Sequence, residues 1–306
     1  MQPEATVGAA LDDAVARLRA SGSATARLDA ELLVAHAIGV ERTAVVAHPE
    51  VPLPPPAARR LVGFVGRRVR GEPVAYIRGV KEFHGLAFAV DARALIPRPE
   101  TELLVDLGVA RVAGALTGSP RPAGSARYRI VDVGTGCGAV AVALAAVLRR
   151  RGFLADTDLL ATDISADALA LAVENAVGHG LAEAIRFARA DLLPPDEPPF
   201  DLLLANLPYV PSGDLPRLPV AASFEPALAL DGGPDGLALV RRLLALLPAA
   251  LRPGGGALLE IGAGEAGPLR AALYETLPGW GLALYDDLAG IPRVAELTWP
   301  ATDGSR

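Results

Sequence analysis

Residues 128–150 read YRIVDVGTGCGAVAVALAAVLRR, and this stretch decides the fold. Its apolar start, YRIVDV, has the pattern of a buried strand, and its end, GAVAVALAAVLRR, has the pattern of a helix. Gly134, Gly136 and Gly138 lie where the two meet. Because glycine has no side chain, it allows a backbone to turn sharply and to approach a ligand at the N-terminus of a helix. With Ala139 the loop also fits G-x-G-x-x-A, so the glycines alone leave a dinucleotide site open.

Strand and helix patterns continue to alternate as far as residue 262. The further strand patterns are DLLATDI, IRFARADLL, FDLLLAN and GGALLEIG. Such alternation implies right-handed βαβ crossovers and a mostly parallel sheet, with ligands at the carboxyl ends of the strands. We therefore predict an α/β, Rossmann-like fold with a mostly parallel, doubly wound sheet.

The whole chain divides into three regions. Residues 1–74 hold three helical patterns that each end at glycine, which predicts a small N-terminal helical domain. Residues 75–98 alternate and carry β-branched and aromatic residues, which predicts a β-hairpin linker. Residues 99–302 form the predicted α/β domain. Within it, the segment 114–127 is rich in Gly, Pro, Ser and Ala and is expected to be a surface loop.

Length and composition indicate a globular protein with two domains. The chain has 306 residues, 51% of them apolar, which suffices for a sizeable core. Its acidic, amphipathic start is unlike a signal peptide, and Asp132 with three glycines interrupts the apolar window 130–148. We expect a cytoplasmic protein without a membrane span. The single cysteine, Cys137, excludes a disulfide framework and a multi-cysteine metal site, so we expect no metal.

Charge is divided unevenly along the chain. Residues 1–98 carry 13 basic and 10 acidic side chains, which gives them a net charge of +3. Because the whole chain has a net charge of −6, the remaining residues have a net charge of −9. Nonspecific binding to nucleic acid depends on Lys and Arg that neutralise phosphates. The acidic balance of the larger part therefore argues against stable binding of nucleic acid.

Two aspartates follow the next two strand patterns. Asp163 lies 25 residues after Gly138, where a carboxylate can accept hydrogen bonds from both hydroxyls of a ribose, and Asp191 follows the third strand, where it can touch the adenine. An aspartate after a strand is also a common N-cap, and DISADAL would begin a helix well. Three successive strand ends with a glycine loop and two acids favour a nucleoside site.

The fourth strand pattern ends in Asn206-Leu207-Pro208-Tyr209, which no strand needs for its own stability. An amide or exocyclic adenine nitrogen is a poor nucleophile because its lone pair is delocalised. The Asn206 side-chain oxygen and the Leu207 carbonyl can accept its two N–H groups, and Pro208 restricts the backbone that aims this carbonyl. Tyr209 can lie flat against a planar acceptor group. Such a site orients the nitrogen and stabilises its developing positive charge without a covalent intermediate.

The alternative interpretation of this tetrapeptide is structural. It would be a turn with an asparagine, a proline that ends the strand and a core tyrosine. For an isolated N-x-P-Y we would prefer that interpretation. At the end of the fourth strand after a G-x-G-x-G loop, methylation of a planar nitrogen is the better hypothesis.

Several stretches of the chain match motifs of one known family. They are RLDAELLVAHAIG (27–39), GEPVAYIRGVKEFHGLAFAV (71–90), LIPRPETELLV (95–105), DVGTGCG (132–138), DISADALALAVENA (163–176), FDLLLANLPYVP (200–211), FEPALALDGGPDGL (224–237) and GGALLEIG (255–262). Over nearly its whole length, the chain resembles the HemK-like peptide chain release factor glutamine methyltransferases, the PrmC family. LIPRPETE beside an N-x-P-Y is a specific signature of that family.

This resemblance implies S-adenosylmethionine (SAM) as the methyl donor and release factors as protein substrates. It also implies that the N-terminal helical domain helps to seat the release factor, whose Gly-Gly-Gln loop enters the pocket. The implied SAM-binding residues are Gly134, Thr135, Gly136, Cys137, Gly138, Asp163, Asp191, Leu192 and Asn206, and the implied catalytic residues are Asn206, Leu207, Pro208 and Tyr209. We expect the protein to be a monomer.

Other activities remain as alternatives. The family usually has N-P-P-Y, whereas Leu207 stands at the second position here, although the chemistry needs only its carbonyl. N-L-P-Y is also similar to the motif of ribosomal RNA adenine dimethyltransferases, in which the helical domain typically follows the catalytic one. A ribosomal protein as substrate, an NAD-dependent oxidoreductase and an inactive nucleoside-binding module are the further alternatives. Arg98, Thr101 and Glu225 lie in family motifs and either border the pocket or serve as turn and cap residues.

Overall fold

The structure, a computed structural model, describes residues 6–118 and 126–300. Three predictions from the sequence reach beyond these residues. Positions 1–5 of the predicted helical domain 1–74, positions 119–125 of the predicted surface loop, and the last two positions of the predicted domain 99–302 lie outside the described part of the chain.

The chain separates into two compact units. One comprises Met1–Val80 with Leu218–Phe224, and the other comprises Lys81–Arg217 with Glu225–Arg306. The sequence analysis assigned the short later segment to the α/β domain. In the structure, a Cβ atom added to Gly71 would lie only 2.6 Å from Cγ1 of Val220, so this segment packs directly on the end of the helical unit.

The N-terminal unit is built from helices that bury their apolar faces against one another. The helices are α1 (Val7–Ala20), α2 (Ala26–Ile38), α3 (Arg42–Ala47), α4 (Pro55–Val69) and α5 (Val74–Arg78). Asp29 of α2 is only 5% exposed. Its carboxylate accepts hydrogen bonds from Nε of Arg68 at 2.8 Å and from the hydroxyls of Ser23 and Thr25 at 2.9 Å. A buried charge is tolerated when it is paired in this way, and the pair fastens α4 to α2.

The predicted hairpin is shorter than its sequence pattern indicated. Val74–Arg78 is a helix, ended by Gly79 at φ +69°, and only then do β1 (Val80–Phe83) and β2 (Leu86–Ala89) form the hairpin. The neighbours Tyr76 and Ile77 are both buried, which a helix allows and an alternating strand does not.

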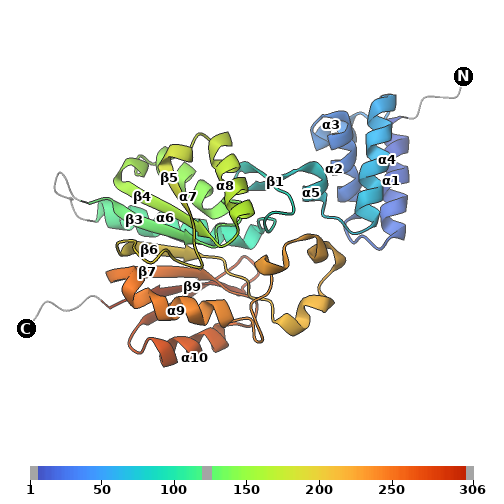
Figure 1. Cartoon of the computed structure of the whole chain (residues 1–306). Helices are drawn as coiled ribbons and strands as arrows, with labels where there is room; N and C mark the ends of the chain where they lie inside the picture. The colour runs from blue at the N-terminus through green and yellow to red at the C-terminus, as the bar shows by residue number, and fades with distance from the viewer. Residues whose placement is uncertain (1–5, 119–125, 301–306) are drawn as a thin grey trace, which may run out of the picture. The chain divides into compact units, whose positions relative to one another are not determined.

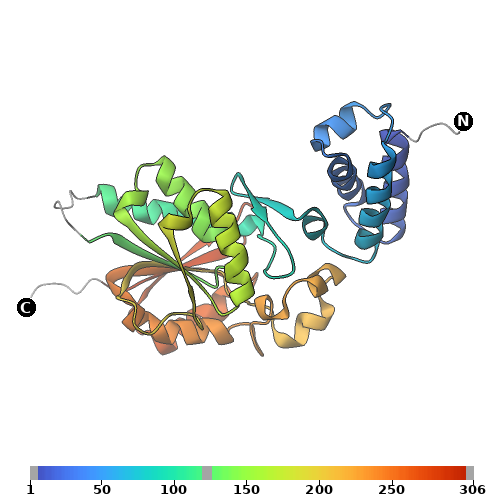
Figure 2. The same ribbon diagram turned by 45° about the horizontal axis from the view of Figure 1, so that its top comes forward.

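Several side chains tie the hairpin to the second unit, and Asn175 is the one that also reaches the glycine loop. Asn175, on α8, accepts a hydrogen bond from the N–H of Ala89 at 2.7 Å and donates to the carbonyl oxygens of Ala89 and Cys137 at 3.0 and 2.9 Å. Figure 2 shows the hairpin beside α8. The hairpin and the glycine loop therefore share one buried anchor.

The second unit contains a seven-stranded sheet with the order β5-β4-β3-β6-β7-β9-β8. The strands are β3 (Tyr128–Val133), β4 (Thr157–Asp163), β5 (Ile185–Arg189), β6 (Phe200–Ala205), β7 (Leu251–Glu260), β8 (Gly281–Asp286) and β9 (Pro292–Thr298). Strands β3 to β7 pair in parallel, and β9 is antiparallel to both of its neighbours. The predicted fold class, α/β and Rossmann-like with a mostly parallel sheet, is confirmed.

Helices cover both faces of this sheet. They are α6 (Glu102–Thr117), α7 (Ala139–Arg150), α8 (Ala166–Gly178), α9 (Ala238–Ala250) and α10 (Ala266–Thr276). Figure 1 shows α6, α7 and α8 on one face and α9 and α10 on the other. Strands β3, β4 and β6 are buried on both sides, as their nearly continuous apolar sequences require, whereas the edge strands β5 and β8 are partly exposed. Within the described residues, no helix combines the length and apolarity needed to cross a membrane.

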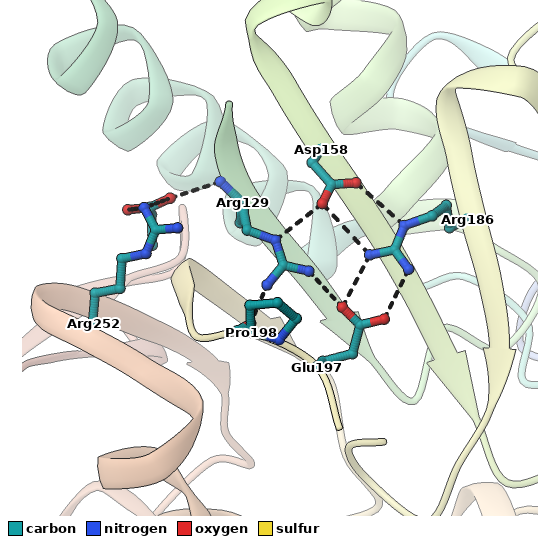
Figure 3. A network of polar contacts seen from close by, with 7 residues as sticks. Arg129, Asp158, Arg186, Glu197, Pro198 and Arg252 are labelled. Atoms are coloured by element: carbon teal, nitrogen blue, oxygen red, sulfur yellow. Dashed lines mark hydrogen bonds and ion pairs between the residues drawn. The ribbon is translucent and has the colours of Figure 1, made fainter. Parts of the chain in front are cut away.

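The amino ends of β3, β4 and β5 are joined by a network of charged side chains (Figure 3). Arg129 and Arg186 both bind the carboxylates of Asp158 and Glu197. Arg129, only 8% exposed, also donates to the carbonyl oxygen of Pro198. Shared partners hold the charges of this network in place, so the amino ends of the strands have a structural role. The cavity lies at their carboxyl ends.

Candidate functional site

A cavity of about 270 Å³ lies at the carboxyl ends of the strands in the second unit. The chain continues from β3 to β4 and β5 on one side and returns to β6 on the other, so the strand order reverses beside β3. Ligands of open α/β sheets bind in the crevice at such a reversal. Of the predicted site residues, Gly134, Thr135, Gly136, Cys137, Asp163, Asp191, Leu192, Asn206, Leu207 and Pro208 line this cavity, whereas Gly138 and Tyr209 do not.

The glycine loop turns from β3 into α7 with a left-handed backbone. Gly134, Gly136 and Gly138 have φ values of +73°, +56° and +82°. The N–H groups of Gly134 and Thr135 both donate to the carbonyl oxygen of Thr162, at 2.9 and 2.8 Å. The first part of the loop is therefore fixed to β4.

Gly138 has a packing role in this structure. A Cβ atom there would lie 3.0 Å from the Cβ and 3.1 Å from the Cα of Ala172, on α8. From the sequence, Gly138 was grouped with the ligand-binding glycines. The short distances to Ala172 indicate that the close approach of α7 to α8 also requires a glycine at this position.

Gly138→Ala is expected to destabilise the protein more than Gly152→Ala, by about 1–3 kcal/mol of unfolding free energy. Both glycines flank α7 with positive φ, at +82° and +77°, so both variants carry a similar backbone strain. Only the first meets another side chain, because nothing lies within 4 Å of a Cβ at Gly152. Urea denaturation of the two variants measures the difference. Equal losses would contradict the packing role.

Asp132 is a cavity residue that the sequence analysis treated only as an interruption of an apolar run. It is 1% exposed, and its Oδ2 accepts a hydrogen bond from the hydroxyl of Thr135 at 2.6 Å. Burial raises the pKa of its carboxyl to about 6, against the effect of hydrogen bonds from Thr135 and the N–H of Ala141. Its signal in the sequence was an acid inside an otherwise apolar strand.

Asp163 stands at the end of β4 and supports the glycine loop. Its two oxygens accept the N–H groups of Gly136 and Ser165, each at 2.9 Å. The N-cap of α8 is Ser165, whose hydroxyl accepts the N–H of Ala168 at 3.2 Å. Ser165, and not Asp163, therefore caps α8, and the Asp163 carboxylate lies in the wall of the cavity.

The third strand end contributes Asp191 and Leu192. Asp191 is half exposed and forms an ion pair with Arg242 of α9 at 2.7 Å. Leu192 has an unusual φ of +67° and is buried, and its carbonyl oxygen accepts a hydrogen bond from the hydroxyl of Thr162 at 2.8 Å. This turn brings an apolar side chain and a carboxylate to the same wall.

The Asn206 side chain lies at the end of β6 with a defined orientation. Its Nδ2 donates to the hydroxyl oxygen of Thr101 at 3.1 Å, which leaves Oδ1 as an acceptor. Leu207 is buried, 6% exposed, and packs against the glycine loop, since a Cβ at Gly134 would lie 3.2 Å from its Cδ2. One wall of the cavity is thus formed by this strand end.

Tyr209 lies next to the cavity, within the same turn. Its backbone is enclosed by glycines, because Cβ atoms at Gly232 and Gly236 would lie 2.8 Å from its Cα and 2.4 Å from its carbonyl oxygen. Its ring faces Gly262, where a Cβ would lie 3.0 Å from Cδ2. Burial is the main cause that raises the pKa of its phenol above the usual value, and the charge of Glu260 raises it further.

Glu260, the last residue of β7, is a second acid that the sequence analysis missed. It is 4% exposed, and its Oε2 has no hydrogen-bond partner within the described residues. Burial raises the pKa of its carboxyl to about 7, although hydrogen bonds from Thr101 and Asn206 lower it. The only sequence signal was an acid after the apolar run GGALL.

Three residues whose roles the sequence left open lie close together. Glu225 accepts hydrogen bonds from Nη2 of Arg98 at 2.6 Å and from the N–H of Ile96 at 3.1 Å. Arg98 and Thr101 line the cavity. Glu225 therefore holds the segment that carries them.

Cys137 lines the cavity but is not activated as a nucleophile. Burial raises the pKa of the Cys137 thiol to about 12, so it stays protonated. Among the residues that the structure describes, no group of three or more His, Cys, Asp or Glu side chains is placed to hold a metal ion. The arrangement instead combines a nucleoside-sized cavity with an orienting amide at its edge.

Comparisons with known proteins agree with this geometry. The PrmC N-terminal domain family matches residues 9–79. The release factor glutamine methyltransferase of Moorella thermoacetica is 42% identical over 261 residues, 85% of this chain and 87% of that protein. The one of Deinococcus radiodurans is 37% identical over 283 residues, 92% of this chain and 95% of that protein. The catalytic domain of human METTL16, solved with an RNA hairpin, has a TM-score of 0.53 at 16% identity, with 82% of this chain and 84% of that one covered, which shows a shared fold.

Proposed function

Because the chain belongs to the release factor glutamine methyltransferase family, we propose that it methylates the glutamine of the Gly-Gly-Gln motif in peptide chain release factors. The transfer would break the S–CH3 bond of SAM and form an N–CH3 bond at the side-chain amide nitrogen, with S-adenosylhomocysteine as the leaving group and one proton lost from the nitrogen to solvent. The observation that carries this proposal is Asn206, which lines a strand-end cavity and donates through Nδ2 to Thr101, so that its Oδ1 is left to accept a hydrogen bond. Relatives matched over most of their length support the same activity.

The residues of the cavity fit a nucleoside such as that of SAM. Left-handed glycines let the backbone come close, and Asp163 provides a carboxylate for the ribose hydroxyls. Leu192 and Leu207 supply buried apolar surface for a flat base, with Asp191 nearby. When bound, SAM supplies an electrophilic methyl group.

The protein contributes orientation and charge stabilisation to the transfer. An amide nitrogen reacts only when its lone pair is turned out of conjugation and toward the methyl group. Asn206 Oδ1 and the Leu207 carbonyl oxygen each accept one N–H of the substrate amide, which fixes that orientation. Both acceptors interact more strongly as the nitrogen becomes positive, so they stabilise the transition state more than the bound substrate.

The same site supports RNA methylation as a second candidate, because an exocyclic adenine amine also presents two N–H groups. Incubation with labelled SAM and, in separate reactions, a release factor, ribosomal RNA and ribosomal proteins tests the choice. We expect label on the release factor alone. Label on RNA, with none on the release factor, would overturn the proposal.

We further propose that the protein acts as a monomer in the cytoplasm. Every residue of the cavity wall belongs to one unit of one chain, so the described site needs no second copy. Release factors act in translation, which takes place in the cytoplasm.

A further inference from the structure

Glu260 and Asn206 are neighbours because their strands are paired. β6 and β7 run parallel, with Ala205 opposite Leu259, so the next residue of each strand, Asn206 and Glu260, emerges at the same level. Thr101, at the start of α6, reaches both side chains. The acceptor amide of the site therefore stands against a buried carboxyl group.

Glu260 is poorly explained as a structural residue. Buried polar groups are almost always paired, yet its Oε2 has no partner within the described part of the chain. A second buried glutamate in the same sheet shows the contrast. Glu296 accepts a hydrogen bond from the hydroxyl of Tyr285 at 2.6 Å and pairs with Arg111 at 3.2 Å. The acid with one oxygen unpaired within the described residues lies beside the site, and the fully paired one lies on β9.

We propose that Glu260 is a positioning residue for methyl transfer, which orients and polarises Asn206 through its amide group. This inference rests on the proposed glutamine methyltransferase activity. An asparagine amide can be rotated by half a turn, which exchanges its donor and its acceptor. An ionised carboxylate only accepts hydrogen bonds, so it holds Nδ2 on its own side and turns Oδ1 toward the substrate.

The charge of Glu260 has a second effect. A hydrogen bond to an ionised acceptor is stronger than one to a neutral acceptor, and it polarises the amide that donates it. Polarisation makes Asn206 Oδ1 a better acceptor for the substrate N–H. The negative charge also favours the positive charge that develops on the substrate nitrogen, at a site where solvent screening is weak.

Three titratable groups of the described chain face Glu260. They are Glu100 from the turn before α6, Arg293 from β9 and Tyr209 from the turn after β6. The pKa values of Tyr209 and Arg293 are both raised, so the phenol stays neutral and the guanidinium stays charged. Because the pKa of Glu260 is raised to about 7, its carboxylate forms as the pH rises through that value.

The test is the pH dependence of single-turnover methyl transfer to a release factor at saturating SAM. The wild-type rate should rise as the pH increases through about 7. Glu260→Gln should lower the rate by about tenfold or more at about pH 8 and remove this rise, because its neutral amide neither ionises nor selects one orientation of Asn206. The affinity for SAM should be unchanged, and Glu296→Gln serves as the control with a wild-type rate and pH profile.

The thermal stability of Glu260→Gln distinguishes a positioning role of Glu260 from a structural one. Burial raises the pKa of Glu260 above its unfolded value, so the folded protein loses stability as the pH rises from about 4.5 to about 7. Glu260→Gln should therefore resist heat at least as well as the wild type at about pH 8. A wild-type rate and pH profile in Glu260→Gln, or an equal loss of rate in Glu296→Gln, would overturn the inference. A flat wild-type profile would also overturn it, whatever the variant does. Wild-type protein that transfers no methyl group to the release factor would instead refute the proposed function.

Discussion

Asn206→Ala is expected to lower the single-turnover rate of methyl transfer to a release factor by about 10²–10³-fold, as removal of a single oxyanion-hole donor does. The variant loses an acceptor whose hydrogen bond strengthens as the amide nitrogen becomes positive. Such a loss appears in the chemical step rather than in ground-state binding. The affinity for SAM should change by less than about tenfold, since the rest of the cavity wall is intact. Rapid-quench measurements with the enzyme in excess separate the two quantities.

Leu207→Pro is the matched control for Asn206→Ala. It changes the neighbouring residue but keeps the carbonyl oxygen that accepts the second N–H, and a proline suits the extended backbone required before Pro208. We expect a rate within about tenfold of the wild type. The Leu207 side chain is buried, so a loss of roughly 1 kcal/mol of stability is expected as well. A loss of rate as large as that of Asn206→Ala would show that the account omits a function of the Leu207 side chain or N–H.

Asp163→Ala is expected to weaken SAM binding at least tenfold. Two hydrogen bonds from ribose hydroxyls to a carboxylate contribute roughly 2–4 kcal/mol together. The same carboxylate accepts the N–H groups of Gly136 and Ser165, so its removal also loosens the glycine loop. Isothermal titration calorimetry of the folded variant measures the change in Kd.

Asp167→Ala is the control for that measurement. Asp167 is an exposed acid in the first turn of α8, outside the cavity wall. Its removal alters the charge at the same helix end without touching the ligand, and the affinity for SAM should stay at the wild-type value. If Asp163→Ala also kept that value, Asp163 would have no part in the cofactor site.

The sequence predicts the central part of the fold well because β3, β4 and β6 are buried on both faces. Their apolar runs are nearly continuous and their ends are marked by Gly, Asp or Asn. Strands β8 and β9 were not predicted. Residues 281–286 of β8 are half-buried or exposed and resemble an ordinary surface segment, whereas β9 is largely buried. The helix at Val74–Arg78 was mistaken for part of a hairpin because five residues are too few to distinguish the two periods.

Asp163 and Asn206 were singled out from the sequence because each lies next to other polar or glycine-rich strand ends. Asp132 lies inside β3, and Glu260 ends β7 after an apolar run, so neither drew attention on its own. Only the register of the sheet brings Glu260 to Asn206. Gly138 shows a different limit of sequence-based prediction, because a glycine can be required either for the approach of a ligand or for close helix packing, and the sequence pattern is the same in both cases.

The most direct test of the whole account is the position of the transferred methyl group. A release factor is incubated with the wild-type protein and SAM, digested, and sequenced by tandem mass spectrometry. We predict one added methyl group on the side-chain nitrogen of the glutamine in the Gly-Gly-Gln motif, and none after reaction with Asn206→Ala for the same short time. A methyl group on any other residue, or an unmodified Gly-Gly-Gln peptide beside methylated RNA, would contradict the account.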